Sequence, residues 1–138
     1  MPELILAHDL GTTGNKASLF DPEGHAVTSA FWPYATAYPR PGWAEQDPAE
    51  WWRAVRESTR RLFAGSDRAA GDVAAVAFSG QMMGCVPVDG GGTPLRPAII
   101  WADTRAEEEA ALLAERVGAE RVYRITGHRP SSSYTAAK

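Results

Sequence analysis

The sequence predicts an α/β domain with a mixed sheet, which combines an N-terminal antiparallel meander with flanking helices. Three short apolar segments separated by turn residues come first, a helix pattern follows, and an uninterrupted apolar segment comes next. Short strands joined by turns form antiparallel hairpins, and a strand that follows a crossover helix returns parallel to the sheet. At 138 residues, 44% of them hydrophobic, the chain has the size of one domain with a core.

The meander is predicted from three strands, expected at about 4–8, 16–20 and 26–32. The first connection is Asp9-Leu10-Gly11-Thr12-Thr13-Gly14 and the second is Asp21-Pro22-Glu23-Gly24. Glycine, proline, aspartate and threonine favour turns because of their backbone freedom or their side-chain hydrogen bonds. Consecutive strands joined so closely must run antiparallel.

A helix start follows a proline-containing loop. Asp47 is a favourable N-cap, Pro48 suits the first helical position, and Glu50 completes a capping-box pattern. The helix is expected to end near Ala64, before Gly65. Its predicted apolar stripe contains Trp52, Val55, Thr59, Leu62 and Phe63.

Three apolar segments follow this helix. Val73–Ser79 predicts a buried strand covered on both faces, because six apolar residues follow one another without alternation. Cys85–Val88 predicts a short strand ending at Asp89-Gly90-Gly91-Gly92, and Leu95–Trp101, interrupted by proline, predicts a short or edge element.

The last third is predicted to be helical. One helix is expected from Asp103 to Gly118, with an acidic first turn at Glu107–Glu109, and a shorter helix at about 119–125. The residues expected to face inward in the first of these helices are Ala106, Ala110, Leu113 and Val117.

Composition argues against several classes. The net charge of −3 gives no basic footprint for nucleic acid or an anionic membrane, and the apolar runs are far shorter than a membrane span. The start, Met1-Pro2-Glu3, lacks the basic region of a signal peptide, and Cys85 is the single cysteine. We therefore expect a cytoplasmic protein with no nucleic-acid or membrane partner, while self-association stays open.

The first turn has the residues of a phosphate site. Asp9 can hold a magnesium ion through water, Gly11 allows close approach of backbone N–H groups, Thr12 and Thr13 offer hydroxyls, and Lys16 adds a positive charge. The spacing is not that of a Walker loop. The alternative is an ordinary hairpin turn with its usual residues.

Two more groups of chemically useful side chains follow predicted strands or apolar segments. Each residue has a structural alternative: Gln81 can cap backbone groups, Trp101 can fill the core, and Asp103 can cap the next helix. Together with the turn they fit a pocket that binds a polyhydroxylated substrate and phosphorylates it. The candidate substrate-binding residues are Gln81, Met82, Met83, Trp101, Asp103 and Arg105.

Four ordered motifs resemble the N-terminal end of the FGGY carbohydrate kinases, and among them xylulokinase most of all. The resemblance covers nearly the whole chain and implies an actin-like ATPase fold of the ribonuclease H type. It also implies ATP and Mg²⁺ as cofactors and a sugar hydroxyl as phosphoryl acceptor. The motifs are Asp9-Leu10-Gly11-Thr12-Thr13-Gly14, Gly42-Trp43-Ala44-Glu45-Gln46-Asp47-Pro48 with Trp51-Trp52, Ser79-Gly80-Gln81-Met82, and Trp101-Ala102-Asp103-Thr104-Arg105.

The resemblance assigns roles to the turn. Asp9 matches the metal-associated aspartate of the family, Gly11, Thr12 and Thr13 match its phosphate-contacting residues, and Lys16 matches a position that is often basic and faces the nucleotide phosphates.

The resemblance also assigns a sugar-binding role to the later motifs, with one departure. Gln81 and Met82 match the start of a Gln-Met-His motif, but Met83 stands where xylulokinases usually have histidine. Asp103 and Arg105 match polar residues after the family's tryptophan. A thioether cannot replace the hydrogen bonds of an imidazole, so the departure puts pentulose specificity in question.

The resemblance further implies a longer protein. In family members the aspartate that acts as general base and the second, nucleotide-binding domain lie beyond the position that matches Lys138. We therefore expect residues 1–138 to be an N-terminal kinase domain that is inactive alone and works with its missing C-terminal domain. The alternatives are a non-catalytic actin-like module, or a kinase for glycerol, gluconate or ribulose.

Overall fold

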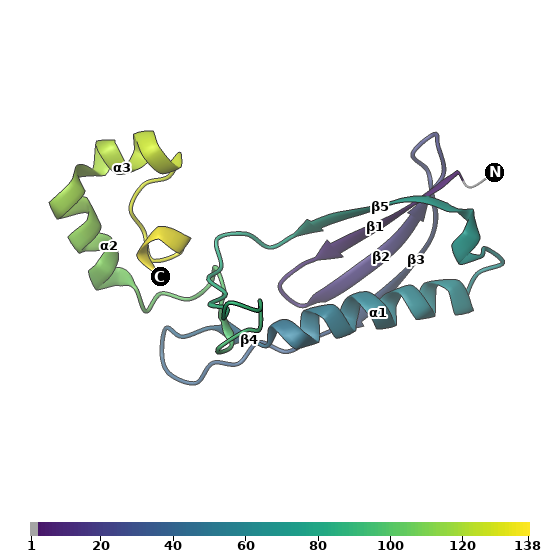
Figure 1. Ribbon diagram of the computed structural model, residues 1–138, viewed down its shortest axis with the longest axis horizontal. Helices are drawn as coiled ribbons and strands as arrows, with labels where there is room; N and C mark the ends of the chain where they lie inside the picture. The colour runs from purple at the N-terminus through teal and green to yellow at the C-terminus, as the bar shows by residue number, and fades with distance from the viewer. Residues whose placement is uncertain (1–2) are drawn as a thin grey trace. The chain divides into compact units, whose positions relative to one another are not determined.

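The computed structural model describes residues 3–138, which form two compact units (Figure 1). The first, here called the sheet unit, contains the chain up to Ala35 together with Ala49–Gln81. The second, here called the C-terminal unit, contains Thr36–Pro48 and Met82–Lys138. Each unit is described by itself below.

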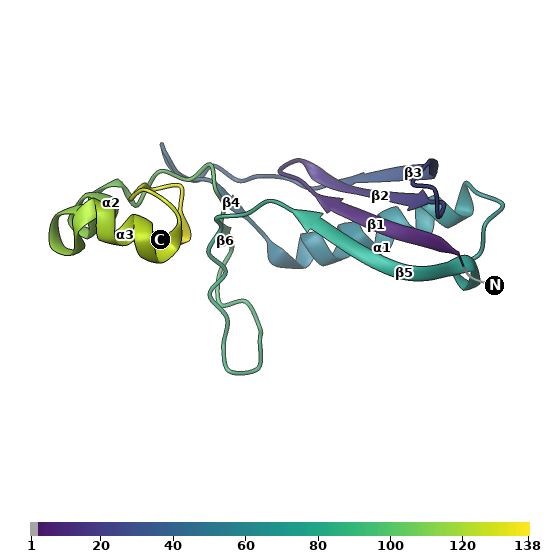
Figure 2. The ribbon, with the colours of Figure 1, turned by 90° about the horizontal axis from the view of Figure 1, so that it is seen from above.

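The sheet unit is a four-stranded mixed sheet with strand order β3-β2-β1-β5. The pairs β1–β2 and β2–β3 are antiparallel, and β5 pairs parallel to β1. Figure 2 shows α1 lying along one face of this sheet. The predicted meander, helix and parallel crossover are therefore confirmed. The elements are β1 (Leu4–Leu10), β2 (Gly14–Phe20), β3 (Ala26–Pro33), α1 (Pro48–Ala64), a 3₁₀ turn (Ala70–Asp72) and β5 (Val73–Gly80).

An apolar core joins α1 to the sheet. Alternate residues of β1 and β2 point toward the helix, as the two-residue period of a strand requires. Val55 and Leu62 of the predicted stripe of α1 are buried, and the small residues Ala54 and Ser58 are buried with them, but Trp52 is 62% exposed. The buried cluster consists of Leu4, Leu6, Ala17, Leu19 and Leu62.

Strand β5 contradicts the prediction that both of its faces are covered. All of its residues after Val73 are exposed, with Val76 at 53% and Phe78 at 62%. Among residues 3–138, β5 is the edge strand next to β1, and the apolar core of α1 lies beneath β1 and β2. A continuous apolar sequence predicts a strand but cannot say which neighbours cover it.

The C-terminal unit is built from short elements. The predicted strand at Cys85–Val88 is wrong: this stretch makes only isolated bridges, Cys85 to Ile99 and Val88 to Pro94, within an extended hairpin visible below β6 in Figure 2. The elements are β4 (Glu45–Gln46), β6 (Ala98–Ile99), α2 (Glu107–Leu113), a π-helical turn (Ala114–Gly118), α3 (Ala119–Thr126) and a 3₁₀ turn (Thr135–Ala137).

The helix predicted from Asp103 begins four residues later. Ala106 takes the N-cap position of α2, while Asp103 lies in the preceding turn. Gly118 separates the helices as predicted, with a φ of 88° that glycine tolerates best. Ala106 and Ala110 are buried as expected, but Val117, which lies in the π-helical turn, is 38% exposed. Of residues 3–138, none lies in a helix long and apolar enough to cross a bilayer.

Candidate functional site

Charged side chains gather on the face of the sheet opposite α1. Asp9 of β1 is paired in register with Lys16 of β2 and with Ser79 of β5. These three residues are here called the Asp9–Lys16 row. Residues paired across strands share a face, and the even-numbered Leu4 and Leu6 of β1 point to the helix, so Asp9 points away from it. A cavity of about 340 Å³ is lined by all three polar residues.

Neither charge of this row is neutralised within the described chain. Asp9 and Lys16 are both exposed, and within residues 3–138 neither forms an ion pair. A carboxylate and an ammonium group at one cavity therefore remain available for a ligand that carries both a cation and anionic oxygens.

The turn beside this row is held internally. The Gly11 N–H donates to the Gly14 carbonyl at 3.0 Å, so that amide already has a partner. A Cβ at Gly14 would lie 2.3 Å from the Phe31 ring and 2.5 Å from the Trp32 carbonyl. Packing against β3 therefore explains the glycine at position 14.

Tyr34 fixes the turn from outside and was missed by the sequence analysis. Its hydroxyl donates to the Gly11 carbonyl at 2.5 Å, and its N–H donates to the Thr13 carbonyl at 3.2 Å. Burial, and secondarily the charge of Asp9, raises the pKa of Tyr34 to about 12. Its position just after β3 is the only sequence signal that could have suggested this contact.

A buried polar network lies on the helix side of the same strands. The fully buried Asn15 donates through Nδ2 to His8 Nδ1 at 2.9 Å and to Ser58 Oγ at 2.7 Å. Ser58 Oγ in turn donates to the Val55 carbonyl at 3.1 Å. The His8 ring stacks on Phe78 with 5.1 Å between centroids, and burial lowers the pKa of His8. This network connects β1 and β2 to α1.

The predicted substrate loop starts where β5 ends. The Gln81 N–H donates to the Leu10 carbonyl at 2.8 Å, which continues the β1–β5 ladder by one residue. Met82 is 73% exposed, and Met83 has a positive φ of 66°.

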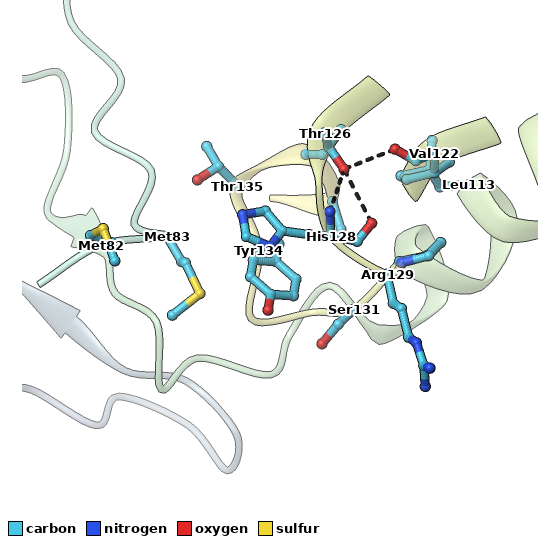
Figure 3. A pocket seen from close by; sticks show the side chains of 13 residues that line it. Met82, Met83, Leu113, Val122, Thr126, His128, Arg129, Ser131, Tyr134 and Thr135 are labelled. Atoms are coloured by element: carbon cyan, nitrogen blue, oxygen red, sulfur yellow. Dashed lines mark hydrogen bonds between the residues drawn. The ribbon is translucent and has the colours of Figure 1, made fainter. Parts of the chain in front are cut away.

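Met82 and Met83 line a cavity of about 550 Å³ in the C-terminal unit, here called the methionine cavity. In Figure 3, His128 and Tyr134 lie together beside Met83, and their rings stack with centroids 4.2 Å apart. No motif of the sequence predicts a role for these two residues, although both follow the last predicted helix. The remaining lining residues are Leu113, Val122, Thr126, Arg129, Pro130, Ser131, Thr135, Ala136 and Ala137.

Asp103 and Arg105 form a compact ion-pair cluster instead of lining that cavity. Asp103 is fully buried; its carboxylate accepts bonds from the Ala44 N–H at 2.7 Å and from Arg105 Nη2 at 2.6 Å. Arg105 also pairs with Glu45 at 2.8 Å and lies 3.6 Å from the centre of the Trp43 ring.

The electrostatics of this cluster favour both charged forms. Burial alone would raise the pKa of Asp103, but hydrogen bonds from Arg105 and Ala44 outweigh it and hold that pKa below its ordinary value. The bond to Asp103 raises the pKa of Arg105. Arg105 Nη1 is buried and has no hydrogen-bond partner within residues 3–138.

The structure thus groups the predicted site residues in three places. Asp9 and Lys16 lie beside the turn in the sheet unit, Met82 and Met83 line a cavity in the C-terminal unit, and Asp103 and Arg105 pair with each other. Trp101 is 41% exposed, and neither it nor Gln81 lines the methionine cavity.

Comparisons with known proteins identify the family to which the chain is similar. The N-terminal domain of the FGGY family of carbohydrate kinases matches residues 4–138. The xylulose kinase of Escherichia coli strain K12 is 38% identical over 135 residues, which are 98% of this chain and 27% of that protein. The glycerol kinase of Methylorubrum extorquens strain PA1 is 36% identical over 139 residues, covering 100% of this chain and 28% of that protein.

A solved structure shows the same fold. The crystal structure of a xyloylose kinase from Brucella ovis superposes with a TM-score of 0.89 at 36% identity, over 97% of this chain and 28% of that one. The chain spans about a quarter of the length of the relatives it matches. Its match to the family over nearly every residue, with the predicted mixed sheet in place, means that the chain belongs to the FGGY family of carbohydrate kinases and corresponds to their N-terminal domain.

Proposed function

We propose that this chain is the part of an ATP-dependent sugar kinase that binds nucleotide phosphates at the sheet and the phosphoryl acceptor at the methionine cavity. The observation that carries the proposal is the Asp9–Lys16 row, two opposite charges on neighbouring strands without ion-pair partners in residues 3–138. Family membership and relatives named xylulose kinase and glycerol kinase support the reaction class.

The turn and its neighbours fit a magnesium–nucleotide ligand. The exposed Lys16 ammonium would neutralise phosphate oxygens. Thr13, three residues earlier and also exposed, would offer its hydroxyl as a further donor. Gly11 and Thr12 complete the predicted phosphate-contacting turn, to which the Tyr34 hydroxyl donates a hydrogen bond.

The Asp9 carboxylate is the proposed Mg²⁺ contact. Residues 3–138 contain no group of three or more histidine, cysteine or acidic side chains that could enclose a metal. Magnesium binds through one or two carboxylates while keeping water and phosphate ligands, so Asp9 alone is sufficient. When bound, Mg²⁺ would neutralise charge on the phosphates during transfer.

The acceptor is proposed to be a ketopentose such as xylulose, bound beside Met82 and Met83. Gln81, Trp101 and Arg105 do not line this cavity, and their proposed roles as sugar contacts rest on the family resemblance alone. Asp103 would then act mainly by orienting Arg105, since its own oxygens accept bonds within the chain. Glycerol, ribulose and gluconate are the competing acceptors.

Catalysis requires the acceptor hydroxyl and the transferred phosphoryl group to be held in line, with a base to receive the hydroxyl proton. We assign that base to none of residues 3–138, and we propose that a further, nucleotide-binding domain supplies it. The chain alone is therefore expected to bind without turnover.

Binding and turnover measured on the 138-residue chain test this proposal. Titration with Mg·ATP, followed by backbone amide NMR, should shift signals of residues 9–16, and Lys16→Met should weaken the interaction about tenfold through loss of a charge-assisted contact. Arg53→Met, at an exposed position of α1, is the matched control and should bind as the unmodified chain does.

A second titration series with xylulose, ribulose, gluconate and glycerol identifies the acceptor by the shifts of the methionine methyl groups. Preference for glycerol would replace xylulose as the proposed substrate. Nucleotide binding with no response to any acceptor would favour a non-catalytic module, and sugar-dependent ADP release by the chain alone would overturn its proposed inactivity.

A further inference from the structure

The backbone of Met83 adopts a conformation that most residues avoid. Its φ of 66° makes it the single non-glycine residue with positive φ in the described chain. A side chain at positive φ crowds the backbone, so such a conformation persists only where surrounding contacts impose it. Met83 is not at a tip of the molecule but in the wall of the methionine cavity.

Two hydrogen bonds from Lys138 and Thr135 impose this backbone conformation on Met83. Lys138 Nζ donates to the Met83 carbonyl at 3.4 Å, and Thr135 Oγ1 donates to the adjacent Gly84 carbonyl at 3.1 Å. The carbonyls of the two peptide units that follow the Met83 Cα are therefore held by residues more than 50 positions later in the sequence.

Lys138 also ties this loop to two other segments. Its ammonium donates to the Ile100 carbonyl at 2.6 Å and to the Ser133 carbonyl at 3.0 Å. An ammonium group has three donors, so Met83, Ile100 and Ser133 use all of them. Burial lowers the pKa of Lys138, which agrees with a side chain turned into the unit.

We propose that Lys138 and Thr135 are positioning residues that hold Met83 in its left-handed conformation and thereby fix its thioether in the wall of the acceptor cavity. The positioning follows from the contacts; the link to the acceptor rests on the proposed function. These residues act on acceptor binding, whereas nucleotide contacts belong to the sheet unit.

Methionine-methyl NMR on the 138-residue chain tests the positioning directly. Lys138→Met keeps most of the length of the side chain but removes all three donors. We expect the Met83 methyl signal to move and broaden, and the Gly84 and Cys85 amides to exchange with solvent at least tenfold faster. Lys16→Met is the matched control, because Lys16 is the only other lysine, and it should leave these signals unchanged.

Thr135 provides an independent variant if loss of Lys138 unfolds the unit. Thr135→Val preserves shape and removes the bond to Gly84, while Thr135→Ser restores a hydroxyl. The valine variant should shift the Met83 signal and the serine variant should return it. An unchanged Met83 signal and unchanged amide exchange in both Lys138→Met and Thr135→Val would overturn the proposal.

Acceptor titration separates this inference from the proposed function. If the unmodified chain binds an acceptor, Lys138→Met should weaken that binding at least threefold and leave Mg·ATP binding unchanged; equal acceptor binding would overturn the link to the cavity. If the unmodified chain binds no acceptor while Met83 still responds to both variants, the positioning is supported and the proposed acceptor site fails.

Discussion

The two units of the chain are stabilised by different kinds of interaction. The sheet unit buries alternating leucines and alanines of β1 and β2 against Leu62 of α1. The C-terminal unit instead centres on the buried Asp103 carboxylate, which receives an N–H from Ala44, 59 residues away in sequence, and the guanidinium of Arg105. Apolar burial is non-directional and tolerates adjustment, whereas a buried charge depends on each of its partners.

Asp103→Ala should be the most damaging substitution. It would leave the buried Arg105 charge with Glu45 as its remaining partner and remove the acceptor of the Ala44 N–H. Breaking a buried ion pair from one side costs about 3–5 kcal/mol in the free energy of unfolding. Hydrogen exchange of the Ile99 and Ile100 amides measures this loss of stability within the C-terminal unit.

Asp67→Ala, whose side chain is 91% exposed, is the control for Asp103 and should change the free energy of unfolding by less than about 0.5 kcal/mol. A loss below about 1 kcal/mol for Asp103→Ala would mean that the ion-pair cluster is not what stabilises this unit.

Leu62→Ala should destabilise the sheet unit. Leu62 is 1% exposed, and truncating a buried leucine costs about 2–5 kcal/mol through lost burial and the cavity left behind. Exchange of amides in β1 and β2 reports the loss. Leu95→Ala, at a position 66% exposed in the C-terminal unit, is the control; similar losses for the two variants would contradict the proposed core.

Tyr34→Phe should have a smaller effect, concentrated in the phosphate turn. It removes the hydroxyl that donates to the Gly11 carbonyl, worth about 0.5–1.5 kcal/mol. The Gly14 amide should exchange faster, and Mg·ATP should bind more weakly. Tyr38→Phe, at a residue 70% exposed, should behave as the unmodified chain. If Tyr34→Phe leaves the amide exchange of the turn unchanged, the bond from the Tyr34 N–H is sufficient to hold the turn.

The pH dependence of the sheet unit should be the weakest effect. Burial lowers the pKa of His8 in the folded chain, while an unfolded histidine titrates near pH 6.5. Below about pH 6.5 the unfolded chain takes up a proton that folded His8 resists, so the free energy of unfolding falls as the pH falls. Urea unfolding at pH 7.5 and 5.5 measures this fall.

His8→Gln removes the titrating group and should make the sheet unit less dependent on pH over that interval. His25→Gln should not, because the His25 side chain is 79% exposed. Equal slopes for His8→Gln and the unmodified chain would exclude His8 as the source of the dependence.

The same contrast explains how much of the structure could be predicted from the sequence. The sheet unit follows local rules, since strand alternation and the Pro48 helix start predict β1, β2, β3 and α1 within a few residues. The exposure of Trp52 and β5 could not be predicted, because periodicity identifies an apolar face without identifying what covers it.

The candidate site shows the same limit. The sequence alone suggested that Asp9 and Lys16 belong together, since they flank one turn, and their register pairing agrees. It could not suggest the contacts of Asp103 with Ala44 or of Lys138 with Met83, because these partners are separated by 59 and 55 residues. Asp103 was expected either at a helix start or at a sugar; its position in an ion-pair cluster depends on tertiary contacts.

The exposed strand β5 has a consequence for the behaviour of the chain in solution. Its sequence, VAAVAFSG, contains neither a charge nor a proline, the two features with which proteins usually discourage pairing between exposed edges. Val76 and Phe78 add apolar area to that edge. We therefore expect concentrated samples of the 138-residue chain to associate edge to edge through β5, and we expect Ala75→Lys to reduce that association.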